Sequence, residues 1–411
     1  MSSISSTIET ARSALRAQQI ALNVTGDNIA NVNTPGYSRK TPNLKTGFTV
    51  AGYGTGVKVE SLTRARDLLL DGQFRFEGHS LGNLEVLERA MRSIEAIFTE
   101  LAGGGASEPG TVFNQASSSA LSGGFSRFFN SFQDLANNPE SQTARAVVRE
   151  EASFLVDQFH RIQDQLSVLR FDMEAEVKQT LLETNRIIRQ LAKLNTKILS
   201  TDVAGSLEDE RDRLLDDLSK LLKINIREQV DGTVAVSAAP GILLVDAAGV
   251  FVNELTTRPV SRNNAVVSDV ALVIDGKAID PVSGKLGGLL QARDEKIVSA
   301  QENLDIVAET LVSRVNLIHS AGFGLDGSSG TNFFIATQDS AREIAISQEV
   351  LGGLDKIAAS STAVGNGDGV NALALSGLAS EKVLGGGNRT IEEFYADLIG
   401  QIGADAKEVF T

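Results

Sequence analysis

The 411-residue chain contains no cysteine and no tryptophan, and aromatic residues make up only 5% of it. The lack of cysteine excludes disulfides, thiolate metal sites and cysteine nucleophiles together. Because 42% of the residues are nevertheless hydrophobic, the composition suits helices that pack closely through small and aliphatic side chains. No apolar run approaches the roughly 18 residues of a membrane-spanning helix, so we expect no contact with a membrane.

Basic residues are too few and too scattered for nucleic-acid binding. The chain has 38 Lys and Arg against 52 Asp and Glu, a formal net charge of −14, and no block of positive charge. A protein that binds DNA or RNA needs a positive patch or stripe. The first ten residues contain no Lys, no Arg and no apolar segment, so we expect no Sec-type signal peptide, and any export would use another route.

Proline is absent between Pro139 and Pro240, and glycine is absent between Gly124 and Gly205. These absences predict one long helix, because both residue types interrupt helices. Its apolar residues follow coiled-coil spacing with one shifted step, a stutter that relaxes the supercoil without ending the helix. The seam consists of Val148, Ala152, Leu155, Phe159, Ile162, Leu166, Leu169, Met173, Val177, Leu181, Ile188, Leu191 and Ile198.

Two other segments carry an apolar seam with the same three-and-four spacing. The later seam consists of Ile297, Ala300, Leu304, Val307, Leu311 and Ile318. The N-terminal seam consists of Ile4, Ile8, Ala11, Leu15, Leu22 and Ile29. Beside the N-terminal seam, Ala14, Ala17 and Ala21 form a narrow stripe that another backbone could approach closely. Pro35-Gly36 ends this helix.

A β-rich stretch interrupts the helical pattern at residues 224–279, where short apolar runs are bounded by Asp-Gly, Pro-Gly and Ala-Gly turns. Elsewhere we predict a loop and a short strand over 48–62, a helix over 67–101, and a final helix that begins at Thr390 with Glu393 completing a capping box. The predicted fold class is therefore mainly α with a β insertion: a coiled-coil-like bundle of long helices from sequence-distant segments, with a small antiparallel β-rich domain inserted between them.

The length of the chain favours two or three compact units. We predict an N-terminal helix and turn over residues 1–45, a helical core in two parts over 46–223 and 289–411, and the inserted β-rich domain over 224–288. Within the second helical part, residues 322–388 are expected to be rich in loops.

No pattern of catalytic residues stands out. His79, His160 and His319 lie far apart in the sequence and each stands alone among helical residues, so a structural histidine is the favoured interpretation of each. The segment LEDERDRLLDDLSKLL, residues 207–222, spaces its carboxylates and arginines for pairs one helical turn apart. We interpret this segment as a solvated helix face.

Two glycine-containing stretches have partial matches to ligand-binding loops. GFGLDG, residues 322–327, has the letters of a dinucleotide fingerprint but follows a predicted helix, where the fingerprint requires a strand before it and a helix after it. NGDGVNA, residues 366–372, resembles part of a calcium loop but lacks the closing acidic residue. A loop and an Asx-type turn, respectively, are the favoured interpretations.

The stretch ALNVTGDNIANVNTPGYSRK, residues 21–40, resembles the N-terminal signature of bacterial flagellar axial proteins of the rod, hook and hook-associated group. In that signature a helix is followed by an Asn-x-x-Asn-x-x-Thr-Pro-Gly-Tyr turn. Ser38 and Arg39 point within the group to the hook-associated proteins of the hook–filament junction. The resemblance runs through nearly the whole chain, with LANNPES, LAKLNTKI, LEDERDRLLDDLS, GKLGGLLQARDEKI, VNLIHSAGFGLDG and RTIEEFYADLIGQIG.

This resemblance implies a structural, non-enzymatic subunit without cofactor or metal, which forms the junction between hook and filament and is required for filament assembly and motility. Its implied location is the flagellum outside the cell. Its implied partners are copies of itself in a lateral ring, the flagellar hook protein, the second junction hook-associated protein, an export chaperone and the flagellar type III export apparatus. Two alternatives stay open: another axial protein, of the hook or distal rod, and, more remotely, an enzyme with its site in the β insertion.

The resemblance also implies how the ends of the chain behave. Residues 1–45 would be disordered in the free monomer and would become an axial helix on assembly, when neighbouring subunits cover its seam, while the β insertion would face outward. The C-terminal axial helix of the family is expected to be absent after Thr411. We hypothesise that the turn joins the axial helix to the outer helical layer, and that its assembly motif consists of Asn28, Asn31, Thr34, Pro35, Gly36, Tyr37, Ser38 and Arg39.

Overall fold

The computed structural model divides the chain into two compact units, each built from segments far apart in the sequence. Unit 1 contains Met1–Val86 and Ala175–Leu289, and unit 2 contains Leu87–Glu174 and Leu290–Thr411. Long helices are present in both units, and the small antiparallel sheets of the described residues lie in unit 1. This combination confirms the predicted fold class. The structure describes residues 2–47, 49–50, 53–54, 56–100, 121–201, 205–239, 242–262, 265–274, 276–279, 283–335, 340–363 and 367–408.

The longest helix is α4 (Gln142–Leu199, 58 residues). It has the length that the missing glycine and proline predicted, and its seam is buried except for Leu169, which is half-buried. Its predicted stutter, after Met173, lies at the point where the chain passes from unit 2 to unit 1. The helices that accompany it in unit 1 are α1 (Ser2–Ala30), the first part of α2 (Leu68–Glu100), α5 (Gly205–Leu221) and α6 (Gly284–Gln291).

The N-terminal strands of unit 1 form a hairpin that the sequence did not predict in full. Instead of a loop and a short strand, β1 (Lys40–Thr46) pairs antiparallel with β4 (Val57–Arg64), and the short strands β2 (Thr49–Val50) and β3 (Tyr53–Gly54) pair with each other. The β1 sequence KTPNLKT is polar and contains a proline, so it lacks the alternating apolar pattern that marks a strand. Its pairing partner, and not its own propensity, makes it a strand.

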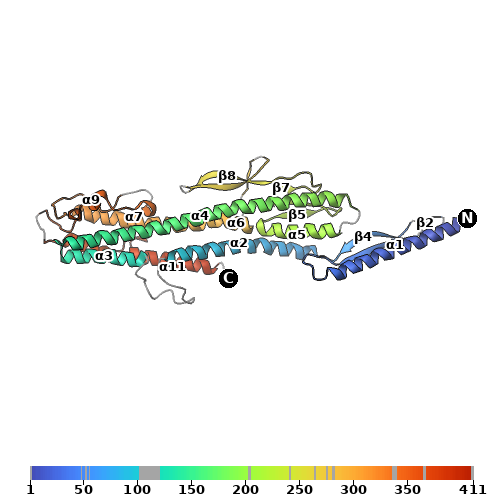
Figure 1. Cartoon of the computed structure of the whole chain (residues 1–411), viewed down its shortest axis with the longest axis horizontal. Helices are drawn as coiled ribbons and strands as arrows, with labels where there is room; N and C mark the ends of the chain where they lie inside the picture. Colours follow the sequence, from blue (N-terminus) through green and yellow to red (C-terminus); the bar gives the residue numbers. More distant parts are fainter. Residues whose placement is uncertain are drawn as a thin grey trace. The chain divides into compact units, whose positions relative to one another are not determined.

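The insertion contains two three-stranded antiparallel sheets, in the orders β5-β6-β7 and β10-β9-β8. In Figure 1 these strands lie along the C-terminal part of α4. Two buried asparagines of α4 form hydrogen bonds with the backbone of the insertion. Asn185 exchanges two hydrogen bonds with the backbone of Leu255, of 2.7 and 2.8 Å, and Asn195 does the same with Val234, at 2.7 and 3.2 Å. The strands are β5 (Asn225–Glu228), β6 (Val234–Ala239), β7 (Ile242–Val245), β8 (Leu255–Arg262), β9 (Ala265–Leu272) and β10 (Ala278–Ile279).

Unit 2 is a helical bundle with a cluster of phenylalanines in its core. The rings of Phe128, Phe132, Phe333 and Phe334 are completely buried, with centroids 4.9–5.8 Å apart in the contacting pairs. This cluster lies where α3 (Leu121–Asn137) meets the loop that follows α7. Aromatic pairs of this kind add about 0.5–1.5 kcal/mol each beyond the area they bury.

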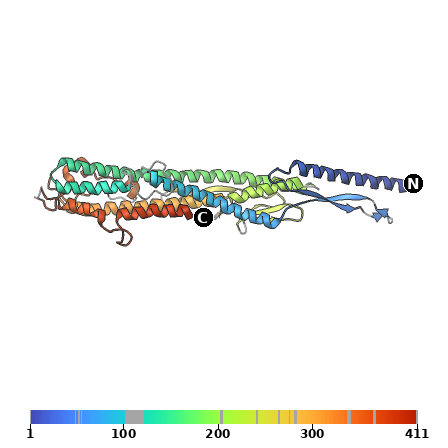
Figure 2. The same ribbon diagram turned by 90° about the horizontal axis from the view of Figure 1, so that it is seen from below.

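The remaining elements of unit 2 surround this core, and Figure 2 shows α3 beside α4 and α7 beside α11. The predicted seam of α7 (Ile297–Ala321) is buried except for Ile318, which is half-buried. The capping box is present at α11 (Ile391–Glu408): Glu393 N–H donates to Thr390 Oγ1, and Thr390 N–H donates to a Glu393 carboxylate oxygen. The other elements are the π-helical turn Ala292–Lys296, α8 (Ser340–Glu343), α9 (Gln348–Gly352), the 3₁₀ turns Leu354–Lys356 and Leu378–Ser380, and α10 (Val370–Gly377).

The two glycine-containing stretches and the histidines have structural roles in the described residues. Residues 322–327 form a loop after α7, and Asp368 makes the predicted Asx turn by accepting from Val370 N–H at 2.9 Å. Asn366 lies outside the described residues. Each histidine has a hydrogen-bond partner: His79 the hydroxyl of Ser283, His160 the carbonyl of Ile344, and His319 the carbonyl of Thr331.

Two glycines of α2 offer a matched test of packing in unit 1. A Cβ at position 82 would lie 2.3 Å from the Lys220 carbonyl oxygen, whereas a Cβ at position 72 would meet nothing within 4 Å. Gly72→Ala is therefore expected to stabilise the protein by up to about 1 kcal/mol through helix propensity. Gly82→Ala should lose this gain and destabilise by about 1–3 kcal/mol through overpacking. Urea unfolding followed by circular dichroism measures both; equal effects would show that α5 does not approach α2 here.

Candidate assembly site

The turn after α1 is organised by one side chain, Asn28. Its Nδ2 donates to the Lys40 carbonyl at 2.8 Å, and its Oδ1 accepts from Lys40 N–H at 2.9 Å and from the Tyr37 hydroxyl at 3.0 Å. The amide therefore pairs with the backbone at the start of β1 as a neighbouring strand would, and orients the tyrosine at the same time.

The middle of the motif is a type II turn. Tyr37 N–H donates to the Thr34 carbonyl at 3.2 Å, with Pro35 and Gly36 at the two central positions. Gly36 has φ of +82°, which a type II turn requires there and which other residues rarely adopt. Before the turn, the Thr34 hydroxyl donates to Asn31 Oδ1, and Asn31 Nδ2 donates to the Asp27 carbonyl. The residue types of the motif thus match the backbone geometry.

Lys40, the residue after the motif, contacts α5. The Lys40 ammonium lies 4.7 Å from the centre of the Tyr37 ring and 3.1 Å from Asp209 Oδ2. Partial burial, and then the negative charges of Asp27 and Asp209, raise the pKa of Tyr37, so its hydroxyl stays a donor. Ser38 is buried, whereas the Arg39 side chain is exposed.

The acidic segment of α5 is a buried ion-pair network, so the interpretation of residues 207–222 as a solvated face was wrong. Asp212 is its centre: its carboxylate lies 2.6 Å from Arg64 Nη1 and 2.7 Å from Arg211 Nη2, and Arg66 and Arg75 approach it within 3.6 and 3.9 Å. The Asp212 side chain is only 5% exposed. Helical spacing alone suggested pairs within α5, but most partners of Asp212 come from β4, α2 and the short segment between them.

The sequence analysis missed these partners because they are isolated arginines in an unremarkable segment. Arg64 ends β4 and is followed by Arg66 in the short Arg-Ala-Arg sequence, and Arg75 stands alone in α2. The available signal was indirect: six carboxylates and two arginines within residues 208–217 of α5 exceed what one solvated helix face usually carries.

The two stripes of α1 have different environments. Along the stripe that includes Ala14, Ala17 and Ala21, α1 packs against its own hairpin, where Val57 N–H donates to Ser13 Oγ at 3.2 Å. Ala17 is 3% and Val24 7% exposed. The predicted apolar seam points the other way. Its five large members are 60–72% exposed and Ala11 is also exposed: Ile4, Ile8, Leu15, Leu22 and Ile29.

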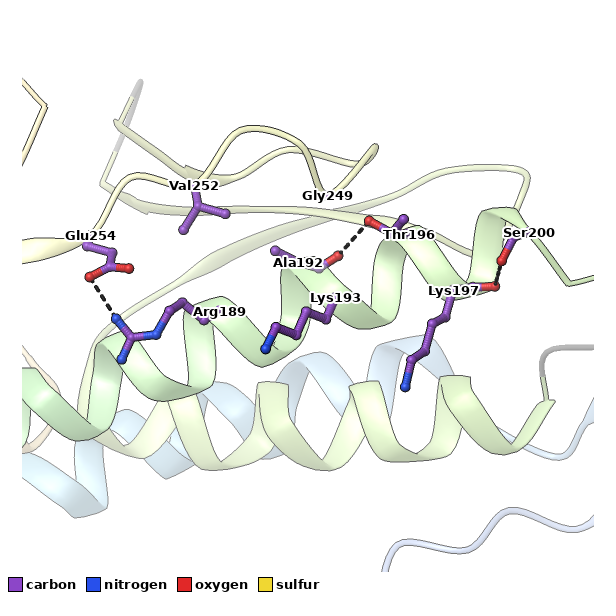
Figure 3. Close-up of a pocket in the computed structure, with 9 residues that line it drawn as sticks. All are labelled: Arg189, Ala192, Lys193, Thr196, Lys197, Ser200, Gly249, Val252 and Glu254. Atoms are coloured by element: carbon purple, nitrogen blue, oxygen red, sulfur yellow. Dashed lines mark hydrogen bonds and ion pairs between the residues drawn. The ribbon is translucent and has the colours of Figure 1, made fainter.

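A shallow groove of about 480 Å³ lies where the insertion meets α4 (Figure 3). Arg189, Lys193 and Lys197 line it from successive turns of α4, and Arg189 Nη1 forms an ion pair of 2.8 Å with Glu254. The ion pair between Arg189 and Glu254 joins the insertion to the helix. Among the described residues, no group of three His, Cys, Asp or Glu side chains could hold a metal ion. In the same described part of the chain, no helix is long and apolar enough to cross a membrane.

Most of the helix with the exposed apolar seam, and the Asn-rich Pro-Gly-Tyr turn, lie in the segment, residues 8–37, that matches the family model described as flagella basal body rod protein. This match places the N-terminal segment in the class of flagellar axial proteins. A second model, described as flagellar hook-associated protein FlgK helical domain, matches residues 107–334, more than half of the chain. The chain therefore belongs to the flagellar hook-associated protein FlgK family, whose members are structural proteins of the flagellum.

Individual relatives agree with this assignment. The chain is 28% identical over 450 residues to flagellar hook-associated protein 1 of Bacillus subtilis, covering 98% of this chain and 85% of that protein. It is 28% identical to the protein of the same name from Salmonella typhimurium, covering 80% of this chain and 59% of that protein. The solved structure of the flagellar hook junction protein FlgK from Burkholderia pseudomallei has a TM-score of 0.66 at 15% identity, with 80% of this chain and 96% of that chain covered, and shares its fold.

Proposed function

We propose that this chain is a subunit of the junction between the flagellar hook and filament, and that filament assembly requires it. The names of its relatives support the hook-associated role, and the match over residues 107–334 favours it over the hook or distal-rod alternatives. One observation carries the mechanical part of the proposal: the apolar seam of α1 is exposed although the opposite face of the same helix is covered.

The exposed seam supports assembly through α1. Burying a large aliphatic side chain contributes about 1.5–3 kcal/mol, so covering five of them would provide a strong drive for association. An isolated helix is marginal in water without such cover. We therefore propose that residues 1–45 are disordered in the free monomer, and that the helix in this segment forms when neighbouring copies, in a lateral ring, bury the seam.

A subunit that lies between the hook and the filament has two further kinds of partner. One end of the subunit would contact the hook protein and the other the second junction hook-associated protein. We propose export through the flagellar type III apparatus, aided by a chaperone, with the acidic surface favouring solubility before assembly. A non-enzymatic role is the simplest interpretation, since the groove beside α4 offers lysines and one ion pair and no converging acid, base and nucleophile.

Asn28→Ala tests the role of the turn. The variant removes the hydrogen-bonding partner of the Lys40 backbone and of the Tyr37 hydroxyl. Leaving these groups unpaired should destabilise the folded turn by about 1–3 kcal/mol. In a deletion strain we expect it to leave swimming motility severely reduced, with subunits secreted but filaments missing from the hooks in electron micrographs.

Asn23→Ala, an exposed position of the same helix, is the matched control and should restore motility fully. The deletion strain itself separates the alternatives. Hooks without filaments support a junction subunit, whereas basal bodies without hooks would indicate a rod or hook protein. Full motility with Asn28→Ala, or with the double variant Pro35→Ala and Tyr37→Ala, would refute the role of the turn. Turnover of a glycan or peptidoglycan substrate by the purified protein would support the enzyme alternative.

A further inference from the structure

One face of α2 in unit 1 exposes large apolar side chains. The opposite face packs on α5 and α6. A Cβ at position 78 would lie 3.2 Å from Ser219 Oγ on α5, and a Cβ at position 288 on α6 would lie 2.7 Å from the carbonyl oxygen of Asn83. The exposed side chains recur at helical spacing, so they share one side of the helix. They are Leu70, Phe74, Leu81 and Leu84, which are 42–60% exposed.

Carboxylates accompany this apolar face. Glu77 lies between Phe74 and Leu81, and Asp67 and Glu85 lie at the two ends; these acidic side chains are exposed. The acidic stripe of α2 is defined here as Asp67, Leu70, Phe74, Glu77, Leu81, Leu84 and Glu85. Two acidic stripes would repel each other, so this surface suits a basic partner surface and not a second acidic stripe.

The C-terminal part of α4, also in unit 1, exposes a stripe of the opposite charge. Leu182 is 70% exposed, and Figure 3 shows Arg189, Lys193 and Lys197 on successive turns of the helix. The basic stripe of α4 is defined here as Leu182, Arg186, Arg189, Lys193 and Lys197. In a chain with a net charge of −14, this run of basic side chains on one helix face concentrates positive charge.

The two stripes match when the helices lie antiparallel with Leu81 opposite Leu182. Four residues before Leu81 stands Glu77. Four residues after Leu182 stands Arg186, so the carboxylate and the guanidinium face each other in this register. An apolar contact and an adjacent ion pair therefore coincide on the same side of both helices.

The same register pairs the next turns as well. Phe74 falls opposite Arg189, where a guanidinium over the ring adds a cation–π attraction. Asp67 falls within one residue of Lys197. No two like charges of the stripes fall opposite each other, so one register satisfies the whole surface.

We propose that the acidic stripe of one copy packs on the basic stripe of the next, and that this contact is the lateral contact of the ring. The proposal rests on the junction function proposed above and names the surfaces that join its subunits. In Figure 1, α2 and α4 run in opposite directions, and rotating a copy about an axis along the helices keeps them antiparallel. A contact between two different surfaces of one chain closes into a ring when the rotation completes a circle. Neither stripe lies within residues 1–45, so the contact does not require that segment to be ordered in the free monomer.

Disulfide cross-linking in assembled flagella tests the contact. Because the chain has no native cysteine, Leu81→Cys with Leu182→Cys places thiols at two opposed, exposed positions alone. The variant is produced in the deletion strain, and isolated flagella are oxidised mildly and run on non-reducing gels. We expect most of the protein to form a ladder of dimers and larger oligomers, which reduction returns to monomer.

Two kinds of control accompany this variant. Each single-cysteine variant should stay monomeric. Leu81→Cys with Lys193→Cys moves the second thiol about 16 Å along α4, beyond the roughly 7 Å between Cα atoms that a disulfide spans, and should give hardly any ladder. If the first pair did not assemble, Glu77→Cys with Arg186→Cys, opposed in the same register, would take its place.

Charge reversal tests the register in the same assay. Added to the Leu81→Cys, Leu182→Cys chain, Glu77→Arg should reduce the ladder about tenfold, because it places two guanidinium groups against each other. Adding Arg186→Glu should restore the ladder. Asp217→Arg, at an exposed position of α5, is the matched reversal and should leave the ladder unchanged.

The outcomes separate the contact from the function on which it rests. A double-cysteine chain that restores filaments but gives no ladder overturns the contact and leaves the junction function standing. Dimers from a single-cysteine variant would mean that a stripe meets its own copy, and a ladder that Arg186→Glu does not restore would contradict the register; either result overturns the proposal. If the parent chain were absent from the hooks and filaments of the complemented strain, the junction function itself would be refuted.

Discussion

Asp212→Asn is expected to destabilise unit 1 by about 3–5 kcal/mol, the usual cost of removing one partner from a buried ion pair. The substitution keeps the size of the side chain but leaves Arg64 and Arg211 without their shared carboxylate, which is 2.6 and 2.7 Å from them. The nearby positive charges of Arg66 and Arg75 would then repel those of Arg64 and Arg211 without a carboxylate between them. Urea unfolding of the full chain, followed by circular dichroism and by hydrogen exchange in residues 205–221, measures the loss.

Asp217→Asn is the matched control, because Asp217 is exposed on the same helix. It removes an equal charge and should change stability by no more than about 0.5 kcal/mol. A similar loss from both variants would show that net charge, and not the network, is responsible.

The same network gives a pH dependence with a definite sign. Burial by itself raises the pKa of Asp212, but attraction to Arg211, with hydrogen bonding and attraction to Arg64, outweighs it, so the pKa lies below its ordinary value. Because this pKa is lower in the folded protein, the unfolded chain takes up the proton at a higher pH than the folded chain does. The stabilisation is therefore complete above the ordinary value of about 4 and is lost as the pH falls below it. Asp212→Asn should lack this acid-induced loss.

The second large effect is expected at His319 in unit 2. Burial, opposed by the Thr331 carbonyl and reinforced by the positive charge of Arg145, lowers the pKa of His319 from 6.5 to about 4. Its Nδ1–H donates to the Thr331 carbonyl at 2.7 Å, so Nε2 is free to accept from Ala358 N–H at 2.9 Å. Protonating Nε2 would place two donors against each other in a site with no exposed surface.

Because the unfolded chain binds this proton at higher pH than the folded one, stability should fall as the pH drops from about 6.5 to about 4, by roughly 3 kcal/mol in total. Unfolding midpoints in urea near pH 7 and near pH 4.5 measure the change. His319→Gln should be less stable at neutral pH and lose most of this slope. His160→Gln, in the same unit, should keep it. An unchanged slope in His319→Gln would contradict the assignment.

Much of the fold was predictable because the relevant interactions are local. The helix α4 follows from a stretch without glycine or proline, the start of α11 follows from Thr390 and Glu393, and the turn at Pro35-Gly36 follows from the conformations that these residues prefer. Strand β1 was not predictable because its sequence carries no strand pattern and depends on β4 for its hydrogen bonds. The pairing of Asn185 and Asn195 with strands of the insertion likewise joins residues 39 to 70 positions apart.

For the candidate site, the sequence by itself determined which residues form the turn and that α1 has two stripes, an apolar seam and an alanine stripe. Only the tertiary structure decided that the alanine stripe covers the hairpin and leaves the seam exposed, and that Asp212 is buried among arginines from β4 and α2. The physical reason is that spacing along a helix specifies which side chains share a face. Which partner covers that face, and whether a charge is solvated or paired, depends on contacts between segments distant in the sequence.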